Sequence, residues 1–183
     1  MKKVQLFLFA AIIGLATLIS CSKEEAKGTC SDGIKNQDET GIDCGGVCTA
    51  CKVGTHGKWK SAPVAPILTS FADSIFATFN TNNTYTVDQW KGGTKVVLSG
   101  TYTQAKSSVG NIYTIILNQT SPTVLTAEGI FEVASDNKTM KYEVAQTSPA
   151  ITGVTAPTPA GGIGSTSGGK FGDGNVQNYT RIE

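Results

Sequence analysis

This sequence of 183 residues has a single histidine and almost no net charge. Lys and Arg together number 15, Asp and Glu number 14, and the formal net charge is +1, so no electrostatic field favours nucleic acid as a partner. The single histidine, His56, has no Gly-x-Ser-x-Gly motif to complete a hydrolytic triad. Glu128, Glu132 and Glu143 alternate with apolar neighbours, and we expect them to face solvent rather than to form a catalytic carboxylate pair. The sequence therefore predicts a protein that is not an enzyme.

Long amphipathic helical patterns are absent after residue 21. Thr, Ser, Gly and Asn are abundant instead, and short apolar runs are separated by clusters of turn-forming residues. Such a composition is typical of a β-sheet protein. We therefore expect an all-β fold with little helix.

The N-terminal apolar run, residues 4–19, is too short for a typical membrane span. It lies between two lysines and Cys21, whereas a spanning helix needs about 20 apolar residues. This pattern favours an export signal over a retained transmembrane anchor. The Leu-Ile-Ser-Cys sequence that ends at Cys21 resembles the lipobox of bacterial lipoproteins. That resemblance implies removal of residues 1–20 as a signal peptide, lipidation of Cys21 with acyl chains such as palmitate, and a membrane as partner.

Residues 21–29 are polar and are expected to form a tether. They begin Cys-Ser-Lys-Glu-Glu, which resembles the surface-export signal of some Gram-negative lipoproteins. The resemblance implies a lipid-anchored protein on the outer face of the cell outer membrane. A plain polar tether would use the same residue types, so the periplasmic face is the alternative.

The remaining cysteines are confined to residues 30–52 and are Cys30, Cys44, Cys48 and Cys51. An even cluster in an exported chain predicts two disulfide bonds, with the pairing left open. The Cys-x-x-Cys spacing at Cys48 would also suit zinc, although an oxidising compartment favours disulfides. We expect a small cysteine-rich module that depends on disulfides because it has no room for a hydrophobic core.

Oxygen-bearing side chains lie between these cysteines and form a candidate calcium site. The candidate ligands are Asp32, Asn36, Asp38, Glu39 and Asp43. Calcium takes oxygen ligands in flexible geometry, but the same residue types cap turns, and the two interpretations remain open. The segment resembles the short Cys-x-Asp-Gly…Asp-Cys-Gly-Gly modules of bacterial cell-surface proteins. Apart from calcium, the sequence predicts no cofactor.

Residues 54–183 alternate between apolar and polar residues in short runs. Ile75, Ala77 and Phe79 share one face of such a run, and residues 80–83 form a turn after it. We count eight strands and predict an antiparallel up-and-down barrel, with a β-sandwich as the alternative. Residues 148–177 separate the last two strands and are rich in Pro, Gly and Ser. We expect this segment to form a mobile flap at one rim of the barrel or a disordered loop.

Two further patterns concern the kind of barrel. Gly57-Lys58-Trp59 resembles the Gly-x-Trp opening of the lipocalin family, in which the Trp closes the barrel base. Residues 79–85 and 99–102 resemble the second hairpin and fourth strand of bacterial lipocalin-like domains. The resemblance implies non-catalytic binding of a small hydrophobic or amphipathic ligand.

Four aromatic side chains are candidates for lining a ligand cavity, with core packing as the alternative role: Trp90, Tyr102, Tyr113 and Tyr142. The alternative function is a structural or adhesion module whose barrel is packed solid and whose surface contacts a glycan or a surface protein. An open cavity favours the first function, and a filled interior with exposed aromatics at the rim favours the second.

Overall fold

The computed structural model describes residues 30–182 except residues 37, 50 and 52. The predicted signal peptide, the tether and Cys21 lie outside the described residues. Within the described part of the chain, no helix combines the length and the apolar character needed to cross a membrane.

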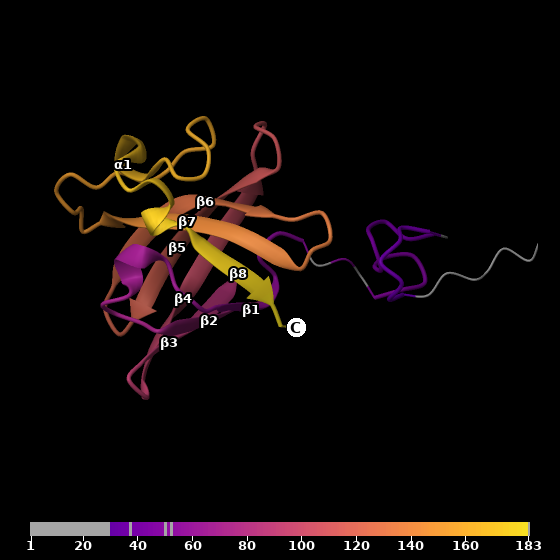
Figure 1. Ribbon diagram of the computed structural model, residues 1–183, viewed down its shortest axis with the longest axis horizontal. Helices are drawn as coiled ribbons and strands as arrows, with labels where there is room; N and C mark the ends of the chain where they lie inside the picture. The colour runs from indigo at the N-terminus through magenta and orange to yellow at the C-terminus, as the bar shows by residue number, and fades with distance from the viewer. Residues whose placement is uncertain (1–29, 37, 50, 52, 183) are drawn as a thin grey trace, which may run out of the picture.

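Eight antiparallel strands close into a barrel in the order in which they occur along the chain (Figure 1). The strands are β1 (Gly57–Ser61), β2 (Ser74–Phe79), β3 (Thr84–Lys91), β4 (Thr94–Lys106), β5 (Ile112–Ser121), β6 (Leu125–Val133), β7 (Thr139–Ser148) and β8 (Gln177–Arg181). The short helices are η1 (Pro66–Leu68), α1 (Thr166–Gly169) and η2 (Gly172–Asn175). β8 pairs with β1, with Trp59 opposite Arg181, and this pairing closes the sheet. The predicted all-β up-and-down barrel is confirmed, and the sandwich alternative is wrong.

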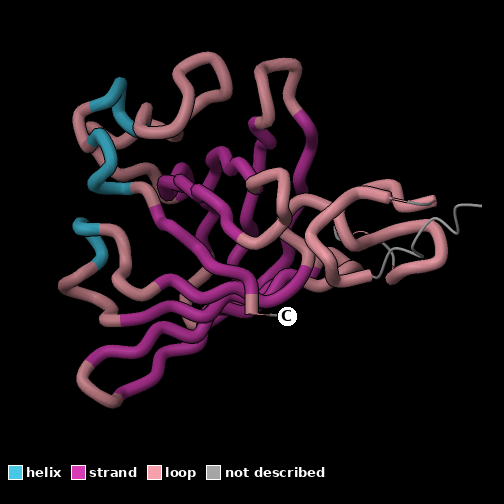
Figure 2. The backbone as a smooth tube through the Cα atoms, turned by 45° about the vertical axis from the view of Figure 1, so that its right-hand side comes forward, coloured by secondary structure: helices cyan, strands magenta, loops and turns pink. Residues whose placement is uncertain are grey.

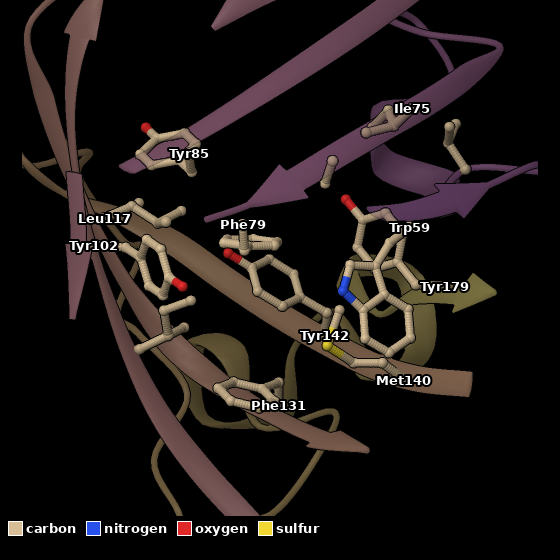
Figure 3. Close-up of a cluster of buried hydrophobic side chains, with 14 of the residues drawn as sticks. Trp59, Ile75, Phe79, Tyr85, Tyr102, Leu117, Phe131, Met140, Tyr142 and Tyr179 are labelled. Atoms are coloured by element: carbon tan, nitrogen blue, oxygen red, sulfur yellow. The ribbon is translucent and has the colours of Figure 1, made fainter. Parts of the chain in front are cut away.

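Period-two alternation explains which side chains fill the barrel. In β2, Ile75, Ala77 and Phe79 are at most 3% exposed, while their neighbours in the chain are half-buried. Phe79 packs edge-on against Tyr102, with ring centroids 5.1 Å apart (Figure 3). The interior therefore consists of interlocking aromatic and aliphatic side chains from all sides of the barrel.

Two glycines allow neighbouring strands to approach each other closely. A Cβ on Gly100 would lie 2.0 Å from the Asn118 carbonyl oxygen, and one on Gly129 would lie 2.0 Å from the Glu143 carbonyl oxygen. The register between β4 and β5 shifts at Gly100, which marks a bulge in the long strand β4. Glycine at these points lets the sheet bend into a closed barrel.

One end of the barrel, called the base here, is closed by Trp59 and Arg181. The Trp59 side chain is fully buried, and its indole N–H donates to the Thr55 carbonyl oxygen at 2.6 Å. The Arg181 guanidinium lies over the indole, 3.9 Å from the ring centre. The N–H groups of the guanidinium donate to the carbonyl oxygens of His56 and Asn137 and to the side-chain oxygen of Asn137. This end of the barrel is therefore sealed by a stacked cation and its hydrogen bonds.

The cysteine-rich module has two disulfide bonds, as predicted. Cys30 pairs with Cys48 and Cys44 pairs with Cys51, with Cα–Cα distances of 5.5 and 4.8 Å. These pairings resolve the connectivity that the sequence left open. Because all four sulfurs are bonded in pairs, none is available as the thiolate that a zinc site needs.

Residues 149–176 form most of the segment 148–177 that the sequence predicts to be a mobile flap or a disordered loop, and they contain regular structure. They contain α1 and η2 and lie against β7 (Figure 1; cyan helices in Figure 2). The Glu143 carboxylate accepts hydrogen bonds from the Gly164 N–H at 2.6 Å, the Thr166 N–H at 2.9 Å and the Thr166 hydroxyl. Glu143 is fully buried, so its predicted exposure to solvent is wrong. The residue alternates outward as expected, but the 149–176 segment covers it.

Candidate ligand cavity

The barrel interior contains a cavity of about 210 Å³. Its lining residues come from η1, η2 and strands β2 to β8. All sixteen lining residues are uncharged, and most of them are aliphatic or aromatic. A concave, mainly apolar space with a few polar groups is the usual form of a small-molecule site.

Alternation along the strands positions the cavity walls. Tyr85, Val87 and Gln89 are successive inward-facing residues of β3. On β5, Leu117 and Gln119 are likewise successive inward-facing residues. Every second residue of a strand faces the same side. Strand β3 therefore contributes an aromatic, an aliphatic and an amide side chain to one wall of the cavity. The cavity therefore has apolar walls with amide groups at intervals.

Three tyrosines of the cavity lining are largely buried, and their hydroxyls are open to the cavity. Tyr85, Tyr142 and Tyr179 are 3%, 5% and 5% exposed. In the described part of the chain, their hydroxyl groups make no hydrogen bond. Burial raises the pKa of Tyr85 to about 12, and burial also raises the pKa of Tyr142 and of Tyr179. All three phenols therefore remain protonated near neutral pH and can donate to a ligand.

Amide side chains fix the cavity wall near β8. The Gln177 side-chain oxygen accepts from the Ser61 hydroxyl at 3.0 Å and from the Ala65 N–H at 2.6 Å. The Asn175 amide donates to the Val144 carbonyl oxygen and to the Thr166 hydroxyl, each at 3.0 Å. Thr166 in turn donates to Glu143. The bonds of Asn175 and Thr166 therefore hold this cavity-lining part of the 149–176 segment against β7.

Of the four aromatic residues predicted to line a cavity, only Tyr142 lines this one. Trp90 alternates outward on β3, is 37% exposed and has the Lys95 ammonium over its ring. Tyr102 is a core residue whose hydroxyl donates to the Asn80 carbonyl oxygen at 3.0 Å. Tyr113 stacks on Phe131, with ring centroids 5.0 Å apart, and does not line the cavity. The core-packing alternative describes Tyr102 and Tyr113, whereas Trp90 lies on the outer surface and has neither role.

The sequence interpretation missed Tyr85 and Tyr179 as cavity residues. Both lie at inward-facing positions, Tyr85 on β3 and Tyr179 on β8. Their inward alternation was the available signal, because the residues that line the cavity face inward on their strands. Some inward residues line the cavity and others are packed in the core. Which of the two applies to a residue depends on the register between strands, which the sequence does not show.

His56 lies outside the cavity lining. Its ring is half-buried and lies edge-on to Tyr102, with ring centroids 6.3 Å apart. Burial lowers the pKa of His56, and the nearby Arg181 charge lowers it further. The imidazole is therefore neutral at pH 7 and is placed beside the cation of the base.

Three of the five candidate calcium ligands, Asp32, Glu39 and Asp43, act as hydrogen-bond acceptors inside the module. Both carboxylate oxygens of Asp43 accept from the Gly33 N–H, at 3.0 and 2.9 Å. Asp32 accepts from the Ile34 N–H and from the Asn36 side chain, and Glu39 accepts from the N–H groups of Asn36 and Asp43. This arrangement supports turn capping. Asp38 is exposed, and calcium binding stays a prediction.

The Glu39 carboxylate also lies near the sulfurs of Cys30 and Cys48. These sulfurs belong to one disulfide bond. The cluster therefore lacks the deprotonated thiols that a transition metal would require.

Comparison of the chain with protein-family models, with curated proteins and with solved structures found no match.

Proposed function

We propose that this chain is an exported, membrane-anchored lipoprotein whose lipocalin-like barrel binds a small ligand without catalysis. The observation that carries the proposal is the uncharged cavity inside the barrel. Its volume of about 210 Å³ is below the roughly 300–1,000 Å³ of pockets for drug-sized molecules. It exceeds the ~150 Å³ of an apolar cavity that accepts benzene. The favoured ligand therefore has the size of one or two fused rings or of a short chain.

Filling the cavity should abolish binding. Ala127 lines the cavity from β6 and is 8% exposed, so Ala127→Phe places a ring in the ligand's space. We expect this variant to bind the neutral fluorescent probe 1-aminonaphthalene at least about tenfold more weakly than the wild type, because overlap of a ring with the ligand costs more than 1.4 kcal/mol. Fluorescence titration measures the affinity.

The matched control is Ala105→Phe on β4. Ala105 is exposed and alternates outward, so the added ring meets solvent. This variant should bind the probe as the wild type does. Equal affinity of Ala127→Phe and the wild type, with both variants folded by circular dichroism, would contradict the proposed site.

The membrane anchor is proposed from the sequence around Cys21. Acyl chains stabilise membrane attachment by about 0.8 kcal/mol per buried CH₂ group, and two or more chains make it stable. The polar residues that follow Cys21 would hold the module and barrel away from the lipid, on the outer face of the outer membrane.

Replacing Cys21 by alanine is expected to release the protein from the membrane. The unlipidated variant should move from the membrane fraction to the soluble fraction of lysed cells, as followed by immunoblotting. Ser22→Ala is the control and should remain in the membrane fraction. Membrane association of Cys21→Ala at the wild-type level would refute the lipid anchor.

A second candidate function is adhesion or another surface interaction. The connections at the barrel end opposite the base carry exposed apolar side chains. These are Ile67, Phe71, Val124, Ile151 and Phe171. Such a rim favours contact with a surface protein or glycan. A Phe71→Ser/Phe171→Ser variant that loses cell adhesion but keeps probe binding would favour this second function.

A further inference from the structure

We propose that the ligand is a neutral, mainly apolar molecule with a carbonyl or hydroxyl oxygen, held by Tyr85, Tyr142 and Tyr179. This inference rests on the proposed function and names the chemistry that the same cavity selects. The three tyrosines reach the cavity from three different strands, β3, β7 and β8.

The hydroxyl groups supply the first argument. A hydrogen bond between a hydroxyl inside a protein and a ligand oxygen contributes about 0.5–1.5 kcal/mol net. The hydroxyls of Tyr85, Tyr142 and Tyr179 make no hydrogen bond to the protein within the described part of the chain, and none of them is a fully buried atom, since Ser165 Oγ is the one fully buried side-chain atom without a partner there. The three hydroxyls are therefore open to the cavity and free to donate to a ligand. In contrast, the hydroxyl of Tyr102, outside the cavity, is hydrogen-bonded. A ligand oxygen in the cavity would supply the missing acceptor.

The positions of the rings supply the second argument. Figure 3 shows the hydroxyls of Tyr142 and Tyr179 directed toward β2, which carries Ile75 and Phe79. Tyr142 and Tyr179 lie edge to face, with ring centroids 5.7 Å apart. Two donors on neighbouring strands, β7 and β8, therefore lie beside the apolar wall that β2 provides. The ligand's hydrocarbon part would contact that wall while its oxygen meets the phenols.

The absence of charge from the lining supplies the third argument. No Asp, Glu, Lys or Arg is among the lining residues of this cavity. An ionised ligand would have to give up its hydration without an opposite charge, which is costly in an apolar environment. The free carboxylate of a fatty or aromatic acid is therefore disfavoured relative to a ketone, ester or alcohol of the same size.

Equilibrium dialysis at pH 7.5 with three probes of one shape tests the inference. 2-Acetylnaphthalene carries a neutral acceptor, 2-ethylnaphthalene lacks it, and 2-naphthoate carries a charge. We expect the wild type to bind the ketone about tenfold more tightly than the hydrocarbon, and at least about tenfold more tightly than the carboxylate. In a Tyr85→Phe/Tyr142→Phe/Tyr179→Phe variant, the ketone and the hydrocarbon should bind equally.

The control variant is Tyr102→Phe/Tyr113→Phe, which removes two hydroxyls outside the cavity and should keep the preference for the ketone. If the triple variant does not fold, Tyr179→Phe alone should reduce that preference. Equal binding of ketone and hydrocarbon by the wild type would overturn this inference and leave the cavity as the binding site. Tightest binding of 2-naphthoate would also overturn it. Failure of all three probes to bind would overturn the proposed function as well.

Discussion

Replacing Glu143 by alanine should lower the free energy of unfolding by about 3 kcal/mol or more. The substitution removes the acceptor for the N–H groups of Gly164 and Thr166 and for the Thr166 hydroxyl. Glu143 is fully buried, and each buried donor left without an acceptor costs about 1–3 kcal/mol. Urea denaturation followed by circular dichroism measures the change.

The control for this prediction is Glu128→Ala on the neighbouring strand β6. Glu128 is exposed, and its carboxylate accepts one hydrogen bond, from the Thr147 hydroxyl. We expect its loss to cost less than about 0.5 kcal/mol. The Glu143 variant should also be cleaved faster within residues 149–176 by a protease, because the segment loses its main attachment to β7. Equal stability of the two alanine variants would show that Glu143 does not hold the segment.

Replacing Trp59 by alanine should lower the free energy of unfolding by about 4 kcal/mol. The indole is fully buried, and the change leaves a cavity at the base of the barrel. It also removes the ring over which Arg181 lies and the hydrogen bond to Thr55. The same urea denaturation measures the loss.

Trp90→Ala provides the matched control because Trp90 is 37% exposed on the outer face of β3. Its loss should cost less than about 1 kcal/mol. If both tryptophan variants lost the same stability, Trp59 would not be the residue that closes the base. A small effect of Trp59→Ala would likewise contradict this role.

Local alternation was sufficient to predict most of the barrel. The runs around Ile75, Leu117 and Tyr142 define strands because each has one apolar face, and turns such as residues 80–83 and 92–93 contain Asn or Gly. Closure of the barrel could also be predicted from the sequence. Eight strands with reversing connections leave no unpaired sheet edge when the last strand pairs with the first. Fold class is therefore set here by patterns within about ten residues.

Features that depend on distant contacts could not be read from the sequence. Glu143 alternates outward, but Gly164 and Thr166, some twenty residues later, cover it. The pairing of Cys30 with Cys48 required the path of the chain between them. Tyr85 faces inward on β3 and Trp90 faces outward, but which inward residues reach the cavity depends on the pairing with the other strands.

The central claim is that the interior of the barrel, and not its surface, holds a small neutral ligand. A titration of methyl-labelled protein with 2-acetylnaphthalene, followed by NMR, tests this claim most directly. We predict that the methyl signals of Val87, Leu117 and Val144, which line the cavity, shift as ligand is added. Shifts confined to Val97 and Ile116, which are exposed on the outer surface, would contradict the claim.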